Sequence, residues 1–267
     1  MQRLSAPAKL TVSLHVTGVR PDGYHLLDAE MVSVDLADTL DLDDGDGIEV
    51  VDEMVGGTGT GALDGGAGNL VARALELVGR RAAVRLVKRI PLGAGLGGGS
   101  ADAAAVLRWA GCDDPEVGVS LGADVPFCMV GGRAQVGGVG EEVVPLPYED
   151  RCYLALLPPL AVDTAAAYRA WDAGDRVDGF AEDGEGGNDL EAAALAVVPA
   201  LAEWRRAFAE ATGARPRLAG SGATWFVDDH DGALARRLGT ELRVGGEVGM
   251  LVLLRTVPAR ASDGSGA

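Results

Sequence analysis

A glycine-rich loop that runs directly into a helix start is the feature of this chain that most constrains its fold. Five glycines occupy the seven positions from Gly93 to Gly99, and Ser100 then opens an alanine-rich segment. Glycine backbone lets several N–H groups approach one ligand, and the start of a helix adds partial positive charge. Loop and helix start together predict a site for a phosphate-bearing ligand, as in nucleotide-binding proteins.

The spacing within the loop separates classes of nucleotide-binding protein. A Walker A motif needs a lysine before its Ser or Thr, and the residue before Ser100 is a glycine. The sequence also lacks the His-Arg-Asp and Asp-Phe-Gly elements of protein kinases. Gly93, Gly95 and Gly98 fit the spacing of dinucleotide-binding Rossmann units, although Pro91 lies where such a unit would turn directly. A dinucleotide-binding oxidoreductase and a purely structural glycine turn remain as alternatives.

Composition is typical of a globular protein that binds a small molecule. The 267 residues are 48% hydrophobic and 4% aromatic, which predicts a core of Ala, Val and Leu. A formal net charge of −17 argues against nucleic-acid and membrane partners. The cysteines Cys112, Cys128 and Cys152 lack the spacing of zinc sites or disulfide frameworks. Without an apolar signal or membrane-spanning segment, we expect a cytoplasmic location.

Lysine is rare in this chain, and this directs attention to the two that it has, Lys9 and Lys88. A net-negative protein that binds phosphate must concentrate its few cations at the site. Residues 9–16 alternate between polar and apolar side chains, so Lys9 and Thr11 share the polar face of a predicted strand. Both lysines are therefore candidates for the site.

The remaining patterns predict an α+β fold with two portions. We expect further strands at 24–36, 38–42, 48–51, 83–88, 152–157 and 249–256, with another after a second glycine loop within 217–227. Helices are expected at 69–78 and 100–110, from Asp163, from an Asn188/Glu191 capping box, and over 199–212, with a loop at 56–68 and a short turn linking 113 to 126. The predicted domains are 1–146 and 147–258, followed by a frayed tail over 259–267.

Several separated segments form one pattern along nearly the whole chain. They are Ala6-Pro-Ala-Lys-Leu10 with Asp22-Gly-Tyr-His25, Pro91 to Ala105, Leu121-Gly-Ala-Asp-Val-Pro-Phe127, and Gly220-Ser-Gly-Ala-Thr224. In this order they resemble GHMP-superfamily kinases, and more narrowly the 4-diphosphocytidyl-2-C-methyl-D-erythritol kinase family. The resemblance implies a two-lobed GHMP kinase fold with the active site between the lobes. It also implies ATP-dependent phosphorylation of that cytidyl alcohol to its 2-phosphate, in non-mevalonate isoprenoid precursor biosynthesis.

The resemblance implies that Lys9 and Asp124 are catalytic and flank the hydroxyl that receives the γ-phosphoryl group. Phosphoryl transfer has a loose transition state, so its catalysis depends on positioning and on neutralising charge. Asp124 would orient the hydroxyl or accept its proton. Lys9 would stabilise the charge of Asp124 and of the transferring group.

Binding residues follow from the same resemblance, with ATP, Mg²⁺ and a cytidine diphosphate alcohol as ligands. The ATP loop would comprise Pro91, Gly93, Gly95, Leu96, Gly97, Gly98, Gly99 and Ser100, and the acceptor end would comprise Thr11, Gly220, Ser221 and Gly222. Lys88 would add charge on the nucleotide side, and Ser100 would reach a phosphate or Mg²⁺. Tyr24 and His25 would bind the cytidine by stacking and hydrogen bonding. Asp102 would only complement the helix dipole.

The sequence also departs from the family pattern. Thr11 stands where the family usually has Asn, and a hydroxyl cannot reproduce the paired hydrogen bonds of an amide. Gly68 replaces the usual acidic residue before Asn-Leu, and the segment 110–121 is shorter than in the family. These departures leave two alternative hypotheses for the function, namely a GHMP kinase for another small alcohol and a nucleotide-binding pseudokinase.

Overall fold

The structure, a computed structural model, contains two β-sheets with helices packed against each. It describes residues 1–55, 65–66, 68–174 and 187–259. The expected loop at 56–68 and the expected tail over 259–267 lie almost entirely outside these ranges. In the described part of the chain, no helix is long and apolar enough to cross a membrane.

The first sheet is built on a long antiparallel hairpin. Its strands are β1 (Gln2–Val19), β2 (His25–Asp43), β3 (Ile48–Asp52), β4 (Ala83–Lys88), β5 (Arg133–Gly138) and β6 (Glu142–Pro145). The order is β3-β4-β2-β5-β6, β1 pairs with β2, and only the β3/β4 pair is parallel among these strands. The expected antiparallel pair is confirmed, although 24–36 and 38–42 belong to one continuous strand. This topology differs from the doubly wound parallel sheet of a Rossmann unit.

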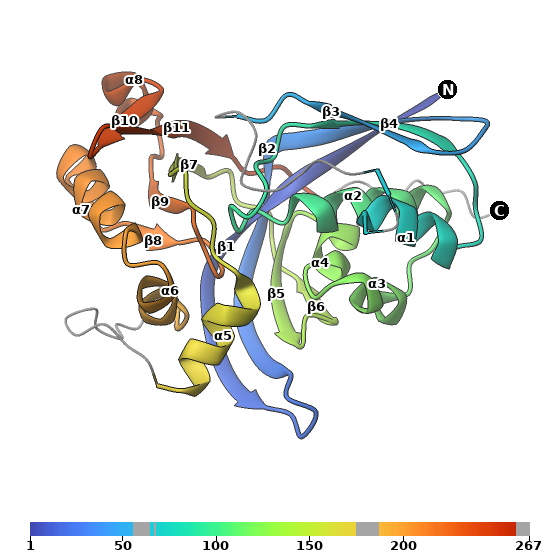
Figure 1. Ribbon diagram of the computed structural model, residues 1–267, viewed down its shortest axis with the longest axis horizontal. Helices are drawn as coiled ribbons and strands as arrows, with labels where there is room; N and C mark the ends of the chain where they lie inside the picture. Colours follow the sequence, from blue (N-terminus) through green and yellow to red (C-terminus); the bar gives the residue numbers. More distant parts are fainter. Residues whose placement is uncertain (56–64, 67, 175–186, 260–267) are drawn as a thin grey trace.

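One face of this sheet carries four helices. They are α1 (Leu70–Leu77), α2 (Gly98–Trp109), α3 (Pro115–Leu121) and α4 (Val125–Val130), grouped beside the β1/β2 hairpin (Figure 1). The expected cap is confirmed, since the Asn69 side chain accepts a hydrogen bond from the Val71 N–H. The expected turn over 113–126 is wrong. Asp114 caps α3 with Pro115 in its first turn, which is a typical helix start.

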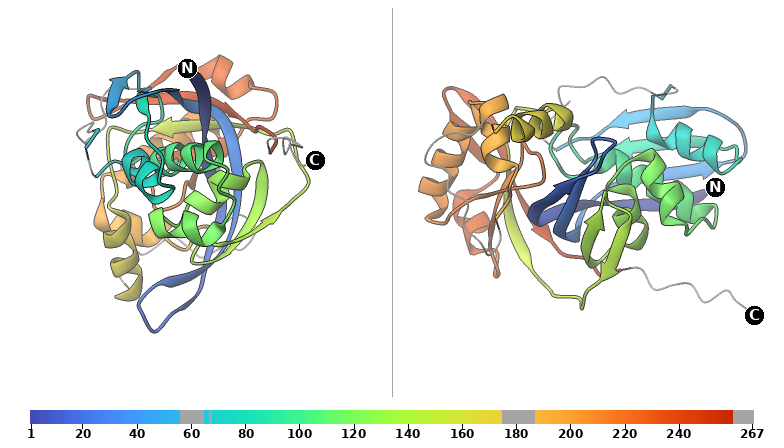
Figure 2. Two further views of the ribbon diagram at one scale, coloured as in Figure 1. Left: turned by 90° about the vertical axis from the view of Figure 1, so that its right-hand side faces the viewer. Right: turned by 90° about the horizontal axis from the view of Figure 1, so that it is seen from below.

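The second sheet begins after a proline-containing linker. Its elements are β7 (Cys152–Leu157), α5 (Thr164–Asp172), α6 (Glu191–Val197), α7 (Leu201–Thr212), β8 (Arg217–Leu218), β9 (Trp225–Asp228), α8 (Ala233–Leu238), β10 (Glu241–Val244) and β11 (Glu247–Arg255). The strands pair antiparallel in the order β10-β11-β7-β9-β8. Helices α5–α8 lie at the opposite end of the molecule from α1–α4, with the β1/β2 hairpin between the two groups (Figure 2). Strand β7 and the Asp163 cap of α5 match the prediction, whereas α8 and β10 were not predicted.

Strand β1 contributes side chains to two hydrophobic cores, because the direction in which its side chains point changes along the strand. Its pairing with β2 is irregular between Pro7 and Lys9 and again between Thr11 and Ser13. Outside this stretch Leu4, Ala6 and Leu14 pack beneath the helices α1–α4, whereas within it Ala8, Leu10 and Val12 pack against the second sheet. A one-residue irregularity moves the following side chains to the other face of a strand. Lys9 and Thr11 are thereby turned toward the helix-covered side.

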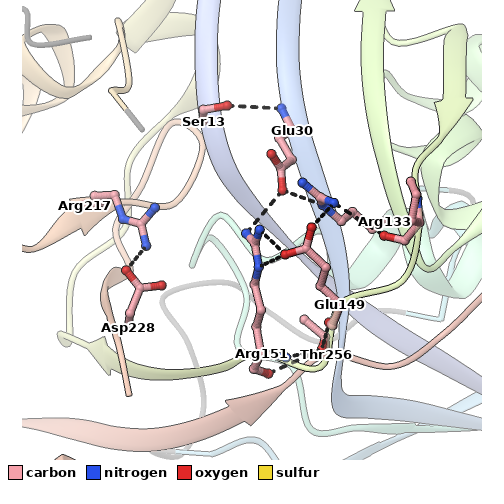
Figure 3. A network of polar contacts seen from close by, with 9 residues as sticks. Ser13, Glu30, Arg133, Glu149, Arg151, Arg217, Asp228 and Thr256 are labelled. Atoms are coloured by element: carbon pink, nitrogen blue, oxygen red, sulfur yellow. Dashed lines mark hydrogen bonds and ion pairs between the residues drawn. The ribbon is translucent and has the colours of Figure 1, made fainter. Parts of the chain in front are cut away.

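A cluster of charged side chains fastens the linker to the first sheet (Figure 3). The Glu30 carboxylate of β2 accepts a hydrogen bond from Arg133 Nε of β5 at 2.8 Å and one from Arg151 at 3.4 Å. Both arginines also pair with Glu149. The cluster therefore joins β2, β5 and the residues that lead into β7.

We expect the substitution Glu30→Gln to lower the free energy of unfolding by about 1 kcal/mol, because it weakens two charge-assisted hydrogen bonds at a partly exposed site. Urea denaturation followed by circular dichroism measures the change. Unchanged stability at low salt would show that Glu149 alone holds the linker.

Candidate active site

A cavity of about 430 Å³ lies between the glycine-rich loop, strand β1, the start of α4 and the second glycine loop. Predicted site residues that line it are Lys9, Thr11, Pro91, Gly93, Gly95, Leu96, Gly97, Gly98, Gly99, Ser100, Asp124, Gly220 and Ser221. The described lining does not include Tyr24, His25, Lys88 or Gly222. Four segments that are distant in the sequence thus meet around one space.

The two predicted catalytic residues are in direct contact. Lys9 Nζ lies 3.2 Å from Asp124 Oδ2 and donates a hydrogen bond to Thr11 Oγ1 at 3.1 Å. The Lys9 side chain is 6% exposed, whereas that of Asp124 is 30% exposed. The ammonium is therefore held from two sides, and the carboxylate remains accessible from the cavity.

Local backbone structure explains how Asp124 is presented. Asp124 occupies the N-cap position of α4, but its side chain makes no capping hydrogen bond. The carboxylate is thus available to Lys9 and to a ligand. On the other side, the Lys9 N–H donates to the Leu96 carbonyl at 3.0 Å, which joins β1 to the glycine-rich loop.

The glycine-rich loop contains positions where a side chain would block neighbouring backbone. Gly95 has a φ of +76°, and a Cβ there would lie 2.4 Å from the Ala219 carbonyl oxygen of the second loop. Helix α2 starts at Gly98, two residues before the predicted Ser100. The N–H groups of its first turn have no acceptor within the helix. Together, Gly98 and Ser100 therefore bring helix-start donors into the cavity lining.

Lys88 is placed differently from the prediction. It is buried behind the loop, where its Nζ donates to Asp38 and, at 2.5 Å, to Asp102 Oδ2. Burial alone would lower the pKa of Lys88, but attraction to Asp102 and Asp38 outweighs it and raises that pKa. Lys88 therefore binds two buried carboxyl groups and does not line the cavity. The expectation that Asp102 complements the dipole at the helix start is likewise corrected, because α2 has no acidic residue in its first turn and Asp102 is a buried acceptor for Lys88.

Asn188 has a role that the sequence interpretation missed. The expected capping box is not formed, since α6 begins at Glu191, whose carboxylate pairs with Arg205 at 3.0 Å. Asn188 Oδ1 accepts a hydrogen bond from the Leu190 N–H at 2.9 Å, while its Nδ2 donates to the carbonyls of Leu218 at 2.9 Å and Gly220 at 2.6 Å. An amide can donate twice and accept at once. Asn188 therefore holds the second glycine loop against the cavity.

The two residues predicted for the cytidine side lie outside the cavity wall. Tyr24 is 63% exposed at the turn between β1 and β2. The His25 ring stacks on Tyr168, with ring centres 4.5 Å apart, and its Nε2 lies 2.7 Å from Asp172 Oδ1. Tyr168 itself lines the cavity, and burial together with the charge of Asp124 raises its pKa. Tyr168, which the sequence interpretation did not single out, is thus the aromatic side chain in the cavity lining, and His25 packs against it. The binding of cytidine by Tyr24 and His25 stays a prediction.

Proteins of known name are similar to this chain over most of its length. Residues 69–112 match the GHMP kinases N-terminal domain. The 4-diphosphocytidyl-2-C-methyl-D-erythritol kinase of Paracoccus denitrificans is 38% identical over 84% of this chain and 86% of that protein. The protein of the same name from Paramagnetospirillum magneticum is 36% identical over 90% of this chain and 93% of its own length.

Solved structures show the same relationship. A crystal structure of 4-(cytidine 5'-diphospho)-2C-methyl-D-erythritol kinase, 33% identical, covers 94% of this chain and 99% of its own, with a TM-score of 0.69. A mevalonate kinase that is 12% identical superposes with a TM-score of 0.58 and shows the shared fold alone. The expected two-lobed GHMP kinase architecture is confirmed. By these similarities over most of its length, the chain belongs to the 4-diphosphocytidyl-2-C-methyl-D-erythritol kinase family of GHMP kinases.

Proposed function

We propose that this protein transfers the γ-phosphoryl group of ATP to a hydroxyl of 4-diphosphocytidyl-2-C-methyl-D-erythritol, forming the 2-phosphate for isoprenoid precursor biosynthesis. The observation that carries the proposal is the contact between Lys9 and Asp124 in the same cavity as the glycine-rich loop. Family membership names the substrate class of the relatives. The cavity supplies the groups that this chemistry needs.

The residues divide the reaction between them. Free N–H groups at the start of α2 bind phosphate oxygens, which favours a triphosphate lying along the loop. The carboxylate of Asp124 orients the acceptor hydroxyl and accepts its proton, and the ammonium of Lys9 stabilises negative charge on the transferring group. The Lys9 side chain is only 6% exposed, so its charge is less screened by water than a surface charge would be.

Mg²⁺ fits the oxygen groups of the cavity. No cluster of three or more metal-ligating side chains occurs among the described residues, but Ser100 and Asp124 both line the cavity. Mg²⁺ commonly takes one or two protein oxygens together with phosphates and water. The ion would neutralise charge on the phosphates, with the Ser100 hydroxyl as its protein ligand.

The position of Thr11 bears on the two alternative hypotheses, a GHMP kinase for another small alcohol and a nucleotide-binding pseudokinase. Its hydroxyl accepts a hydrogen bond from Lys9 Nζ, so the residue that departs from the family pattern still orients the lysine. A retained and oriented Lys9–Asp124 pair supports an active kinase over a pseudokinase. A kinase for a different alcohol is the second candidate, because Thr11 also borders the cavity. The domain boundary at 146/147 and the cytoplasmic location stay predictions.

We expect ATP-dependent release of ADP when the purified protein meets the cytidyl alcohol with Mg²⁺. A coupled ADP assay measures turnover, with homoserine and mevalonate as comparison alcohols. Faster turnover of a comparison alcohol would move the assignment to another GHMP substrate. ATP binding without turnover of any alcohol would support the pseudokinase.

The substitution Asp124→Asn should lower kcat by roughly 100-fold or more, because it removes the group that accepts the proton. ATP affinity should stay within about twofold, since the loop donors are untouched. The matched control is Asp228→Asn, which alters a surface ion pair with Arg217 away from the cavity. Equal kcat values for Asp124→Asn and the control would remove the role assigned to Asp124.

A further inference from the structure

Three buried charged side chains form a cluster directly behind the glycine-rich loop. Asp38 of β2, Lys88 at the end of β4 and Asp102 of α2 are 0%, 3% and 2% exposed. Lys88 Nζ donates to both carboxylates. Such a cluster is unusual inside a core, because removing charges from water is costly unless they are paired.

The cluster holds both ends of the loop. Asp38 Oδ1 accepts hydrogen bonds from the N–H groups of Arg89 and Ile90, the latter at 2.8 Å, just before Pro91 opens the loop. Asp102 lies near the beginning of α2, just after the loop ends. Lys88 bridges these two carboxylates. The entry and the exit of the loop are therefore tied to the same point on β2.

The loop itself packs closely against this cluster. A Cβ on Gly98 would lie 3.2 Å from Lys88 Nζ and 3.0 Å from Ile90 Cγ2. Gly98 faces the cavity on its other side. One backbone layer thus separates the buried ammonium from the space for phosphate, and Lys88 would have to break its hydrogen bonds to both carboxyl groups to contact a ligand.

We propose that Asp38, Lys88 and Asp102 are positioning residues that hold the glycine-rich loop in the shape that binds the ATP phosphates, with Lys88 acting through the loop and not by contact. The inference rests on the proposed binding of ATP at this loop. A glycine-rich segment loses much conformational freedom when it is ordered. A cluster that orders the loop before ATP arrives removes this cost from binding.

The charge balance of the cluster indicates a proton on Asp102. Two carboxylates and one ammonium would leave a buried negative charge, whereas one added proton makes the cluster neutral. Asp38 accepts hydrogen bonds from Lys88, Arg89 and Ile90, but Asp102 Oδ1 has no hydrogen-bond partner in the described structure. Burial raises the pKa of Asp102 to about 8, although the positive charge of Lys88 acts in the opposite direction. The proton is therefore assigned to Asp102.

A double-mutant cycle separates positioning from direct contact. Lys88→Met keeps the apolar stem and removes the ammonium, and Asp38→Asn places an amide where the lysine needs an acceptor. If the cluster positions the loop, each variant should weaken ATP binding about tenfold, and the double variant should lose no more than about 20-fold instead of 100-fold. Isothermal titration calorimetry with ATP and Mg²⁺, without acceptor alcohol, measures the dissociation constants.

Direct contact between Lys88 and the phosphates predicts a different change in ATP affinity. If Lys88 contacted the phosphates, Asp38→Asn would free its ammonium, and ATP affinity would be unchanged or higher. That outcome overturns the proposal, and it decides the question even if Lys88→Met does not fold. The control is Glu30→Gln, which alters another ion cluster on β2 away from the loop. Its ATP affinity should stay within twofold, and a tenfold loss there would mean that general destabilisation explains the effect.

The same titrations separate this inference from the proposed function. Wild-type protein that binds ATP but leaves the cytidyl alcohol unchanged would overturn the substrate assignment. The double-mutant cycle would still test whether the cluster positions the loop. Wild-type protein that binds no ATP would overturn both proposals.

A second measurement tests the proton on Asp102. Unfolded Asp102 loses its proton near pH 4, whereas the folded group keeps it until about pH 8, so wild-type stability falls with pH across this window. Asp102→Asn carries no such proton, and its melting temperature should therefore rise relative to wild type between pH 5 and pH 8. The groups around Asp102 are Asp38, Lys88 and the Cys128 thiol, whose pKa burial raises to about 12. A constant difference in melting temperature would show an ionised Asp102.

Discussion

The contact between the Lys9 ammonium and the Asp124 carboxylate depends on backbone that approaches more closely than side chains would allow. Gly97 has a φ of +67°, and a Cβ there would lie 2.8 Å from Lys9 Cγ. Gly220 lies on the other side, where a Cβ would be 3.3 Å from Lys9 Nζ. The lysine thus passes between two glycine loops. The glycines proposed to bind phosphate therefore also leave room for the Lys9 side chain, and this explains why both loops border one cavity.

Much of the fold and of the site could be predicted from local patterns. The β1/β2 pair, the Asn69 cap and the Asp163 cap follow from alternation and capping chemistry, which act over a few residues. The meeting of Lys9 with Asp124 was implied by resemblance, because no local rule links positions so far apart. The structure then brings them within 3.2 Å.

The predictions that failed concern side chains whose partners come from distant elements. Lys88 was interpreted as a cation available to the nucleotide, because the sequence alone does not show that it contacts Asp38 and Asp102. Asn188 was predicted to form a capping box with Glu191, but only its Oδ1 caps, by accepting from the Leu190 N–H, while its Nδ2 donates to carbonyls of another loop. In each case burial and long-range hydrogen bonding decided the role, and neither can be read from spacing alone.

Strand β1 contributes to two hydrophobic cores, and this has a consequence for modularity. Leu14 packs beneath the first group of helices, while Leu10 and Val12 pack against strands of the second sheet. A fragment that ended at the linker would leave Leu10 and Val12 exposed to water. The halves are therefore not interchangeable building blocks. An exchange of the second half between relatives would succeed only where its inner surface matches the apolar residues of this one strand.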